Sequence, residues 1–245
     1  MSTHGILVDK GLHKDERAIY GVFLTSDFGK VDVIIRGARR NVHRWGASFE
    51  PLEGGEMVLY PVGDRYVLTS YEVDTLPPPF VRNKPSLRMA LALVVSGSVM
   101  KGSEAYSEWN VLVSFLHSKL RGKTAVAKFL LEYISVLGYR VFMSGASCGV
   151  CGKKYDGETQ WFYTPYEGYL VCEGCHILHG DRLGDYPISG ETIKEIVHLK
   201  KVSWESTEDF IGEDAYRLIV DRTSTVVPMN EYVKYVLYKA GGEKV

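Results

Sequence analysis

The feature that most constrains this chain is the spacing of its cysteines. All four occur in two Cys-x-x-Cys pairs that are separated by twenty residues. A two-residue spacer lets a tight turn aim two thiolates at one point, and two such turns joined by a hairpin supply the tetrahedral ligand set that zinc prefers. Strand-like runs at 161–163 and 169–171 lie between the pairs. The pattern therefore predicts a zinc ribbon over 146–180, with one zinc ion bound by Cys148, Cys151, Cys172 and Cys175.

Two other uses of the cysteines fit the sequence less well. A catalytic zinc ion needs an open coordination position, and four thiolates leave none. A redox-active dithiol is expected on a thioredoxin-like strand–helix–strand unit, and the pattern predicts no such unit. In a reducing compartment, paired cysteines also favour metal ligation over disulfides. We therefore expect a structural zinc ion.

The first 76 residues are predicted to form a small β-barrel. Five short runs of alternating or β-branched residues lie at 6–8, 17–25, 31–36, 56–62 and 65–73. Turn signals separate several of them, including Asp27-Phe28-Gly29-Lys30 and the Gly63-Asp64 hairpin. Five strands are typical of an OB-fold. An SH3-like barrel is the alternative, because the number of strands does not separate the two.

The rest of the chain is predicted to be mainly helical, so the fold class is α+β. Pro77-Pro78-Pro79 ends the barrel, since three prolines favour an extended segment. Helical periodicity predicts helices at 86–101, 108–120, 124–137, 189–201, 208–220 and 231–239. Gly138 is placed to end the third helix and Ser189 to cap the fourth. We expect an OB-like barrel at 1–76, a basic helical region at 80–145, the ribbon at 146–180, and C-terminal helices at 181–245 that pack on the helical region.

Charge is distributed unevenly along the chain. The 245 residues carry a net charge of −1, but residues 80–145 carry a balance of +6, whereas 1–79 carry −2 and 146–245 carry −5. A basic middle segment can bind a polyanion even in a neutral protein, although Lys-rich solvated helix faces would give the same count. No apolar run reaches the roughly 18–20 residues of a membrane helix, and residues 1–8 lack a secretory signal. We therefore expect a cytoplasmic protein.

A basic segment follows the third predicted strand directly. Residues 36–45 contain four arginines, one histidine, one tryptophan and no acid. Guanidinium groups bind phosphates and stack on bases, and an indole adds a stacking surface. The alternative is a solvated loop whose arginines pair with Glu50, Glu53 or Glu56. We favour nucleic-acid binding, and the residues predicted to contact it are Arg36, Arg39, Arg40, His43, Arg44 and Trp45.

A second basic cluster consists of Lys119, Arg121 and Lys123, with Lys128 nearby. It spans the end of one predicted helix and the start of the next. A helix N-terminus can receive phosphate, so this cluster is a further candidate for nucleic-acid binding. Ordinary enrichment of basic residues at a helix end is an equally good alternative.

The motifs for catalysis are incomplete. Gly122-Lys123-Thr124 matches the end of a phosphate-binding loop, but His117 stands where the first glycine of that loop is required. Gly145-Ala146-Ser147-Cys148-Gly149 matches the nucleophile-elbow pattern, but it runs into the first cysteine turn. The acidic residues form no obvious paired-carboxylate motif. We therefore expect a binding protein and not an enzyme.

The order of these parts resembles the bacterial RecO recombination-mediator family over nearly the whole chain. In the barrel the resemblance rests on Gly29-Lys30, Arg36-Gly37-Ala38-Arg39-Arg40, Phe49-Glu50-Pro51-Leu52, Glu56 to Tyr60 and Leu68 to Glu72. Beyond the barrel it rests on Phe129-Leu130-Leu131, Leu137-Gly138-Tyr139 and Cys148-Gly149-Val150-Cys151-Gly152. The ordered combination of these motifs carries the resemblance.

The resemblance implies a mediator of DNA repair and recombination that does not hydrolyse nucleotides. Such a protein would bind single- and double-stranded DNA and anneal complementary strands without ATP. With RecR it would help load recombinase on DNA coated by single-strand binding protein, whose C-terminal tail is an expected ligand of the helical region. It would be nucleoid-associated. The rival class is an RNA-binding zinc-ribbon interaction protein of transcription or translation, and comparing DNA with RNA in an annealing assay would separate the two.

Overall fold

The computed structural model of the protein describes residues 1–14, 17–38, 45, 49–102, 104–142, 146–183 and 185–242. The chain divides into two compact units. The first combines Met1–His117 with Met229–Val236, and the second combines Ser118–Pro228 with Leu237–Val245. The finer division into four domains at 1–76, 80–145, 146–180 and 181–245 remains a prediction.

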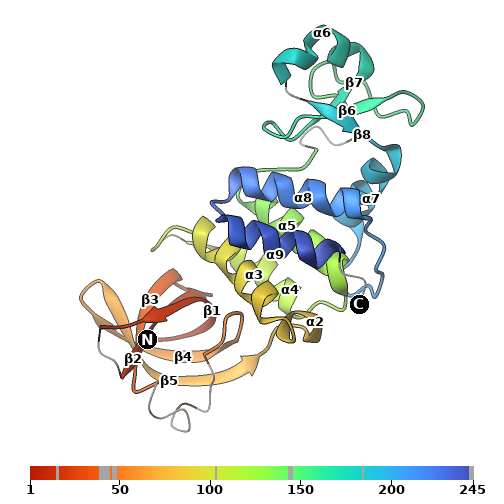
Figure 1. The fold of residues 1–245 in the computed structure, drawn as a ribbon. Helices are drawn as coiled ribbons and strands as arrows, with labels where there is room; N and C mark the ends of the chain where they lie inside the picture. Colours follow the sequence, from red (N-terminus) through yellow and green to blue (C-terminus); the bar gives the residue numbers. More distant parts are fainter. Residues whose placement is uncertain are drawn as a thin grey trace. The chain divides into compact units, whose positions relative to one another are not determined.

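The first unit is built on a closed barrel of five strands (Figure 1). The strands are β1 (Ser2–Leu12), β2 (Ala18–Thr25), β3 (Gly29–Arg36), β4 (Gly54–Val62) and β5 (Arg65–Thr75). Their order around the barrel is β1-β2-β3-β5-β4, with β4 antiparallel to β1 and β3 parallel to β5. Each predicted run overlaps one of these strands, and the predicted OB-like barrel is confirmed.

Alternation along the strands fills the barrel interior with apolar side chains. Val33 and Ile35 of β3 are fully buried, and the same core contains Leu7, Phe23, Met57, Leu59 and Leu68. Close approach of β4 to β5 requires a glycine at position 55, because a Cβ on Gly55 would lie 1.9 Å from the carbonyl oxygen of Glu72. The interior is therefore packed, which leaves the rim and the outer surface of the barrel for ligands.

Helices complete the first unit. They are α2 (Pro79–Arg82), α3 (Pro85–Ser98), which packs against β1, and α4 (Tyr106–Leu116). The expected extended chain across three prolines is wrong at its end, since α2 begins at Pro79. Proline is tolerated at the first helical position because the N–H that it lacks would have no partner there. The first part of α9 (Glu231–Gly242), up to Val236, also belongs to this unit.

Two helices of the second unit pack against α5 (Gly122–Val136). Both α7 (Gly190–Lys201) and α8 (Glu213–Val226) contact α5, whose side chains are mostly buried. As predicted, α5 ends before Gly138, whose φ of 90° suits glycine. Ser189 caps α7 as predicted, by accepting a hydrogen bond from the N–H of Thr192 at 3.1 Å. None of the helices in the described part of the chain has the length and apolar character needed to span a lipid bilayer.

The start of α8 differs from the prediction of a helix over 208–220. The N–H groups of Phe210 and Ile211 donate to the hydroxyl of Thr124, at 3.0 and 3.2 Å, instead of joining a helix. Because Thr124 lies on α5, this contact is remote in sequence. Periodicity along one segment could not show it, and α8 begins only at Glu213.

The cysteine segment folds as a three-stranded ribbon in the second unit. β6 (Trp161–Tyr163) lies between β7 (Leu170–Cys172) and β8 (Tyr186–Ile188), and α6 (Glu173–Leu183) follows β7. β6 and β7 confirm the two predicted runs, whereas the sequence pattern predicts neither α6 nor β8. Arg222 of α8 anchors the ribbon, since its guanidinium group donates to the carbonyls of Pro165 and Tyr166 in the turn between β6 and β7.

Candidate metal centre and nucleic-acid interface

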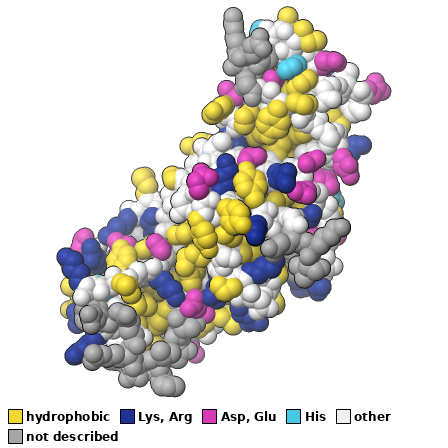
Figure 2. All heavy atoms as spheres, viewed as in Figure 1, with side chains coloured by type: hydrophobic (Ala, Val, Ile, Leu, Met, Phe, Trp, Pro, Cys, Tyr) yellow, Lys and Arg dark blue, Asp and Glu magenta, His cyan; other side chains and the backbone are white. Residues whose placement is uncertain are grey.

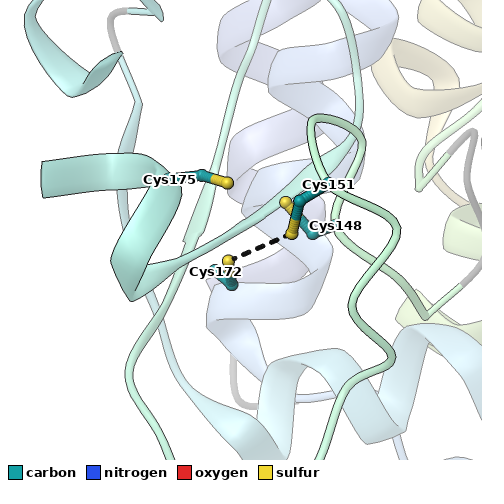
Figure 3. Close-up of side chains that lie close together, drawn as sticks. All are labelled: Cys148, Cys151, Cys172 and Cys175. Carbon is teal, nitrogen blue, oxygen red and sulfur yellow. Dashed lines mark hydrogen bonds between the residues drawn. The ribbon is translucent and has the colours of Figure 1, made fainter. Parts of the chain in front are cut away.

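The four cysteines meet at one point of the ribbon. Their sulfur atoms all lie within 4.8 Å of one another, and Figure 3 shows them pointing towards a common centre. The Sγ atoms of Cys151 and Cys172 are 3.6 Å apart. This distance is much longer than a disulfide bond of about 2.0 Å. It is close to the edge of about 3.8 Å in a tetrahedron whose metal–sulfur bonds are about 2.3 Å.

Backbone hydrogen bonds shape the first Cys-x-x-Cys turn. The N–H of Gly152 donates to the carbonyl of Cys148, and the N–H of Gly149 donates to the carbonyl of Leu170 on β7. A side chain at position 149 would collide with Tyr169, because a Cβ there would lie 2.3 Å from the tyrosine ring. Glycine therefore lets the first cysteine turn rest directly on the strand that ends in the second pair.

The thiols differ in their electrostatic environment. Burial raises the pKa of Cys172 and of Cys175. Burial acts in the same direction on Cys148, but hydrogen bonds from the backbone of Cys151 and Cys172 outweigh it and lower the pKa of Cys148 to about 7. Neighbouring thiolates repel each other, so all four ionise together only around a cation. The arrangement can therefore hold one metal ion through four thiolates.

Only part of the predicted basic loop falls within the described residues. Arg36 ends β3 and is exposed, whereas Arg39, Arg40, His43 and Arg44 lie outside the described residues. Trp45 is 8% exposed, its indole N–H donates to the carbonyl of Arg36 at 3.2 Å, and its ring packs edge-on against Phe49. An indole in this position supports the barrel core. The structure therefore does not favour the predicted stacking role of Trp45.

The second predicted cluster lies at the start of α5. Lys119 and Arg121 are exposed, and Lys123 is half-buried. Lys119 forms an ion pair with Glu205 at 2.7 Å, which raises the pKa of Lys119. Lys128 is different, because it is 2% exposed and its amine is bound to Glu132. Lys119, Arg121 and Lys123 thus remain accessible to solvent to different degrees, whereas Lys128 belongs to the interior.

The barrel carries a further row of side chains, which the sequence motifs did not indicate. Strand register aligns Tyr20 of β2 with Ile34 of β3, Ile34 with Val67 of β5, and Val67 with Tyr60 of β4. All four point outwards, since residues next to them in sequence fill the core. Tyr60 is 64% exposed and the other three are half-buried. We call these four residues the outer row.

Charged side chains flank the outer row. The guanidinium carbon of Arg65 lies 5.7 Å from the ring centre of Tyr20. The carboxylate of Asp32 accepts hydrogen bonds from Tyr20 and from Lys101, whose amine is 2.7 Å away. Burial favours a higher pKa for Asp32, but these hydrogen bonds outweigh it and hold the pKa below its usual value. In Figure 2, Lys and Arg side chains are spread over the barrel and over the helices, with Asp and Glu side chains among them. The outer face therefore places aromatic and apolar side chains next to the guanidinium group of Arg65.

One sequence signal could have pointed to this face. On β4 the outward residues Val58, Tyr60 and Val62 are all large, apolar and exposed. A barrel strand with one solvated face is expected to be polar on that face. Apolar residues on both faces of one strand are therefore a sequence signal of a candidate binding surface. Only the register of the barrel strands shows that Tyr60 lies in one row with residues of the neighbouring strands.

Comparison with known proteins gives no matching family model. Seven curated proteins do match, and each is named DNA repair protein RecO. The protein from Caldanaerobacter subterraneus subsp. tengcongensis is 25% identical over 248 residues, which cover 94% of each chain. The protein from Caldicellulosiruptor bescii is 25% identical over 253 residues, which cover 98% of this chain and 94% of the relative. The protein from Thermoanaerobacter sp. is 21% identical over 242 residues, which cover 96% of this chain and 93% of the relative.

These three matches span nearly the whole chain. They therefore include the barrel, the helices and the cysteine ribbon together, and not one module alone. The order of parts in the structure agrees with the resemblance that the sequence motifs indicate. Over nearly its whole length, the chain is therefore similar to proteins of the RecO family.

Proposed function

We propose that this protein is a mediator of DNA repair and recombination that binds single- and double-stranded DNA and anneals complementary strands without ATP. The observation that carries the proposal is the full-length similarity to proteins named DNA repair protein RecO. The closed barrel supports it, because exposed aromatic and apolar side chains lie next to arginines on its outer face. A surface of this kind suits unstacked bases and phosphates together.

In this proposal, single-stranded DNA lies across the outer row. Tyr60 offers its ring to a base, and Arg36 and Arg65 bind phosphates. The loop residues Arg39, Arg40, His43 and Arg44 follow Arg36 in the chain and extend the phosphate path. Lys119, Arg121 and Lys123 form a second contact in the other unit. Two basic surfaces on one chain would bring two complementary strands together against the repulsion of their phosphates.

We infer that the four cysteines hold one zinc ion with a structural role. Four thiolates in tetrahedral reach favour zinc over the harder divalent metals. They also fill its coordination sphere, so the ion has no open position for water or substrate. When bound, the ion would neutralise the thiolates. The chain itself holds the ligands in place through the first cysteine turn, β7 and the start of α6.

The family resemblance extends the proposal to partners. Together with RecR, the protein would help load recombinase on DNA coated by single-strand binding protein. The C-terminal tail of that coating protein would bind the helical region, and the protein would act in the cytoplasm at the nucleoid. These steps require binding but no turnover, which fits the absence of a complete catalytic motif in the sequence.

An annealing assay tests the proposal. Complementary oligonucleotides with donor and acceptor fluorophores would be mixed with the protein in the absence of nucleotide, both bare and coated with the cognate single-strand binding protein. We expect faster annealing of DNA, and a smaller effect on RNA of the same sequence. No acceleration, or a strict requirement for ATP, would overturn the proposal. A preference for RNA would favour the RNA-binding zinc-ribbon class.

A triple variant, Arg39→Ala with Arg40→Ala and Arg44→Ala, tests the phosphate path. Each phosphate contact contributes about 0.7 to the slope of log affinity against log salt on single-stranded DNA. If all three arginines contact phosphates, the slope of the variant should be shallower by about 2. An unchanged affinity and slope would remove this loop from the DNA site.

A further inference from the structure

A loop rich in acidic residues lies against the basic segment at the start of α5. The loop comprises residues 202–212 between α7 and α8 and carries Glu205, Glu208 and Asp209 but no basic residue. The segment comprises residues 119–124 and carries Lys119, Arg121 and Lys123 but no acid. We call them the acidic loop and the basic turn. Both belong to the second unit.

Backbone contacts fix both ends of the acidic loop to the basic turn. At one end, the carbonyl of Trp204 accepts a hydrogen bond from the N–H of Lys119 at 2.8 Å. At the other end, the N–H groups of Phe210 and Ile211 donate to the hydroxyl of Thr124. Main-chain groups at both ends of the loop therefore hold it beside the basic turn, in addition to any contact of its acidic side chains.

Two of the acids occupy positions that a polyanion would use. The Oε2 atom of Glu205 lies 2.7 Å from Nζ of Lys119, and these side chains are 67% and 64% exposed. An ion pair so exposed contributes little to folding. Asp209 accepts a hydrogen bond from the Thr124 hydroxyl at 2.8 Å, and its other carboxylate oxygen lies beside Gly122. Gly122 is the first residue of α5, where the helix dipole attracts anions.

The other two cations of the basic turn differ from Lys119 in their partners. Among the residues that the structure describes, Arg121 and Lys123 have no ion-pair partner. Glu208 is bound by His198 at 3.1 Å and not by a lysine. A DNA strand that reaches the basic turn therefore meets Arg121 and Lys123, which have no ion-pair partner in the described part of the chain. It also meets Lys119, which is paired with Glu205, and the N-terminus of α5, which already has a carboxylate beside it.

We propose that the acidic loop is a built-in competitor of DNA at the basic turn, so that phosphates must displace the carboxylates of Glu205 and Asp209 to bind there. The inference rests on the proposed function, because it requires that the protein binds DNA. A phosphate that must first displace a carboxylate contributes less binding free energy than a phosphate that meets an unpaired cation. Arg121 and Lys123 bind the first phosphates, and the neighbouring phosphates of the same strand then displace the carboxylates at Lys119 and at the start of α5. The basic turn thereby selects long strands over short or isolated anions.

The test compares Glu205→Gln with the matched control Glu213→Gln in the full chain. Glu213, which is 52% exposed, forms an ion pair with Arg217, which is 60% exposed, and this pair does not involve the basic turn. Both substitutions remove one negative charge. We expect Glu205→Gln to bind a long single-stranded oligonucleotide more tightly and with a salt slope steeper by up to about 0.7. Glu213→Gln should keep the slope of the wild type.

A second pair of variants assigns the gain to the basic turn. Adding Lys119→Ala to Glu205→Gln should abolish the gain, and Asp209→Asn should increase affinity as Glu205→Gln does. If Glu205→Gln and Glu213→Gln increase affinity equally, net charge explains the effect and the competitor is refuted. If the wild type binds and anneals DNA while Glu205→Gln changes nothing, the competitor alone is wrong. If the wild type itself fails to bind DNA, the proposed function is wrong and the inference fails with it.

Discussion

Replacing Tyr60 by alanine should weaken the binding of single-stranded DNA selectively. Tyr60 ends the outer row and is 64% exposed. Among the described residues, no hydrogen bond uses its hydroxyl. The ring is therefore available to stack on a base. Because its removal opens no cavity in the core, the variant should unfold at nearly the wild-type temperature.

The magnitude follows from the energy of stacking. Base–aromatic stacking is worth about 1–3 kcal/mol per base when the aromatic residue is replaced by alanine. Tyr60 lies on an open barrel face and not in a closed cleft, so we expect the lower part of that range, about 1–2 kcal/mol. At 1.4 kcal/mol per tenfold change, Kd should rise about five- to thirtyfold.

Fluorescence anisotropy with a labelled single strand and with a duplex of the same length measures the effect. Bases in a duplex are stacked on one another, so Tyr60→Ala should change duplex affinity little. Tyr60→Phe should bind as the wild type does, because the ring makes the contact. Tyr106→Ala is the matched control, since Tyr106 is 70% exposed on α4 of the same unit. Equal affinities of the two alanine variants for single strands, or equal losses on both DNA forms, would refute the reasoning.

Three further changes test other parts of the molecule. Cys148→Ser should reduce the zinc content, measured by elemental analysis, below about one ion per chain. It should lower the free energy of unfolding by more than it lowers the free energy of DNA binding. An unchanged Tm in metal-free protein would contradict this. Arg222→Met should lower the urea-derived free energy of unfolding by about 1.5–3 kcal/mol, because carbonyls of the β6–β7 turn lose a charged donor, whereas Arg217→Met at an exposed site should change it by less than about 0.5 kcal/mol. Burial lowers the pKa of Lys200 from 10.5 to about 8. Between these two pH values the unfolded chain binds more protons than the folded chain. The free energy of unfolding of the wild type, relative to that of Lys200→Met, should therefore rise with pH across this window.

The features that could be predicted from the sequence have local determinants. Two residues between cysteines fix the direction of both thiols within one turn, so each pair of candidate metal ligands follows from its own spacing. Alternation over Val31, Val33 and Ile35 selects a strand and its inward face without reference to a partner. Ser189 caps α7 through Thr192, only three residues away. In each case the interacting groups lie close together in the chain.

The features that could not be predicted depend on partners remote in sequence. Trp45 looks like a free aromatic in a basic loop, but the fold places its ring against Phe49 and its N–H on the carbonyl of Arg36. Tyr60 and Tyr20 are forty residues apart, and only the parallel pairing of β3 with β5 puts them in one row. The order of strands around a barrel decides such contacts, and no window along the chain contains that order.

Contacts between residues remote in sequence also change the charge that residues 80–145 can offer to a polyanion. Of the nine basic side chains in this stretch, four form ion pairs in the described structure: Arg88 with Glu50, Lys101 with Asp32, Lys119 with Glu205 and Lys128 with Glu132. Three of these four acids lie outside the stretch, so a count along the sequence records as free charge what the fold has already neutralised. A polyanion responds to unpaired charge at the surface. The proposed DNA contacts of this region therefore depend on Arg121 and Lys123, and on how readily Lys119 exchanges Glu205 for a phosphate, and not on the net charge of the stretch.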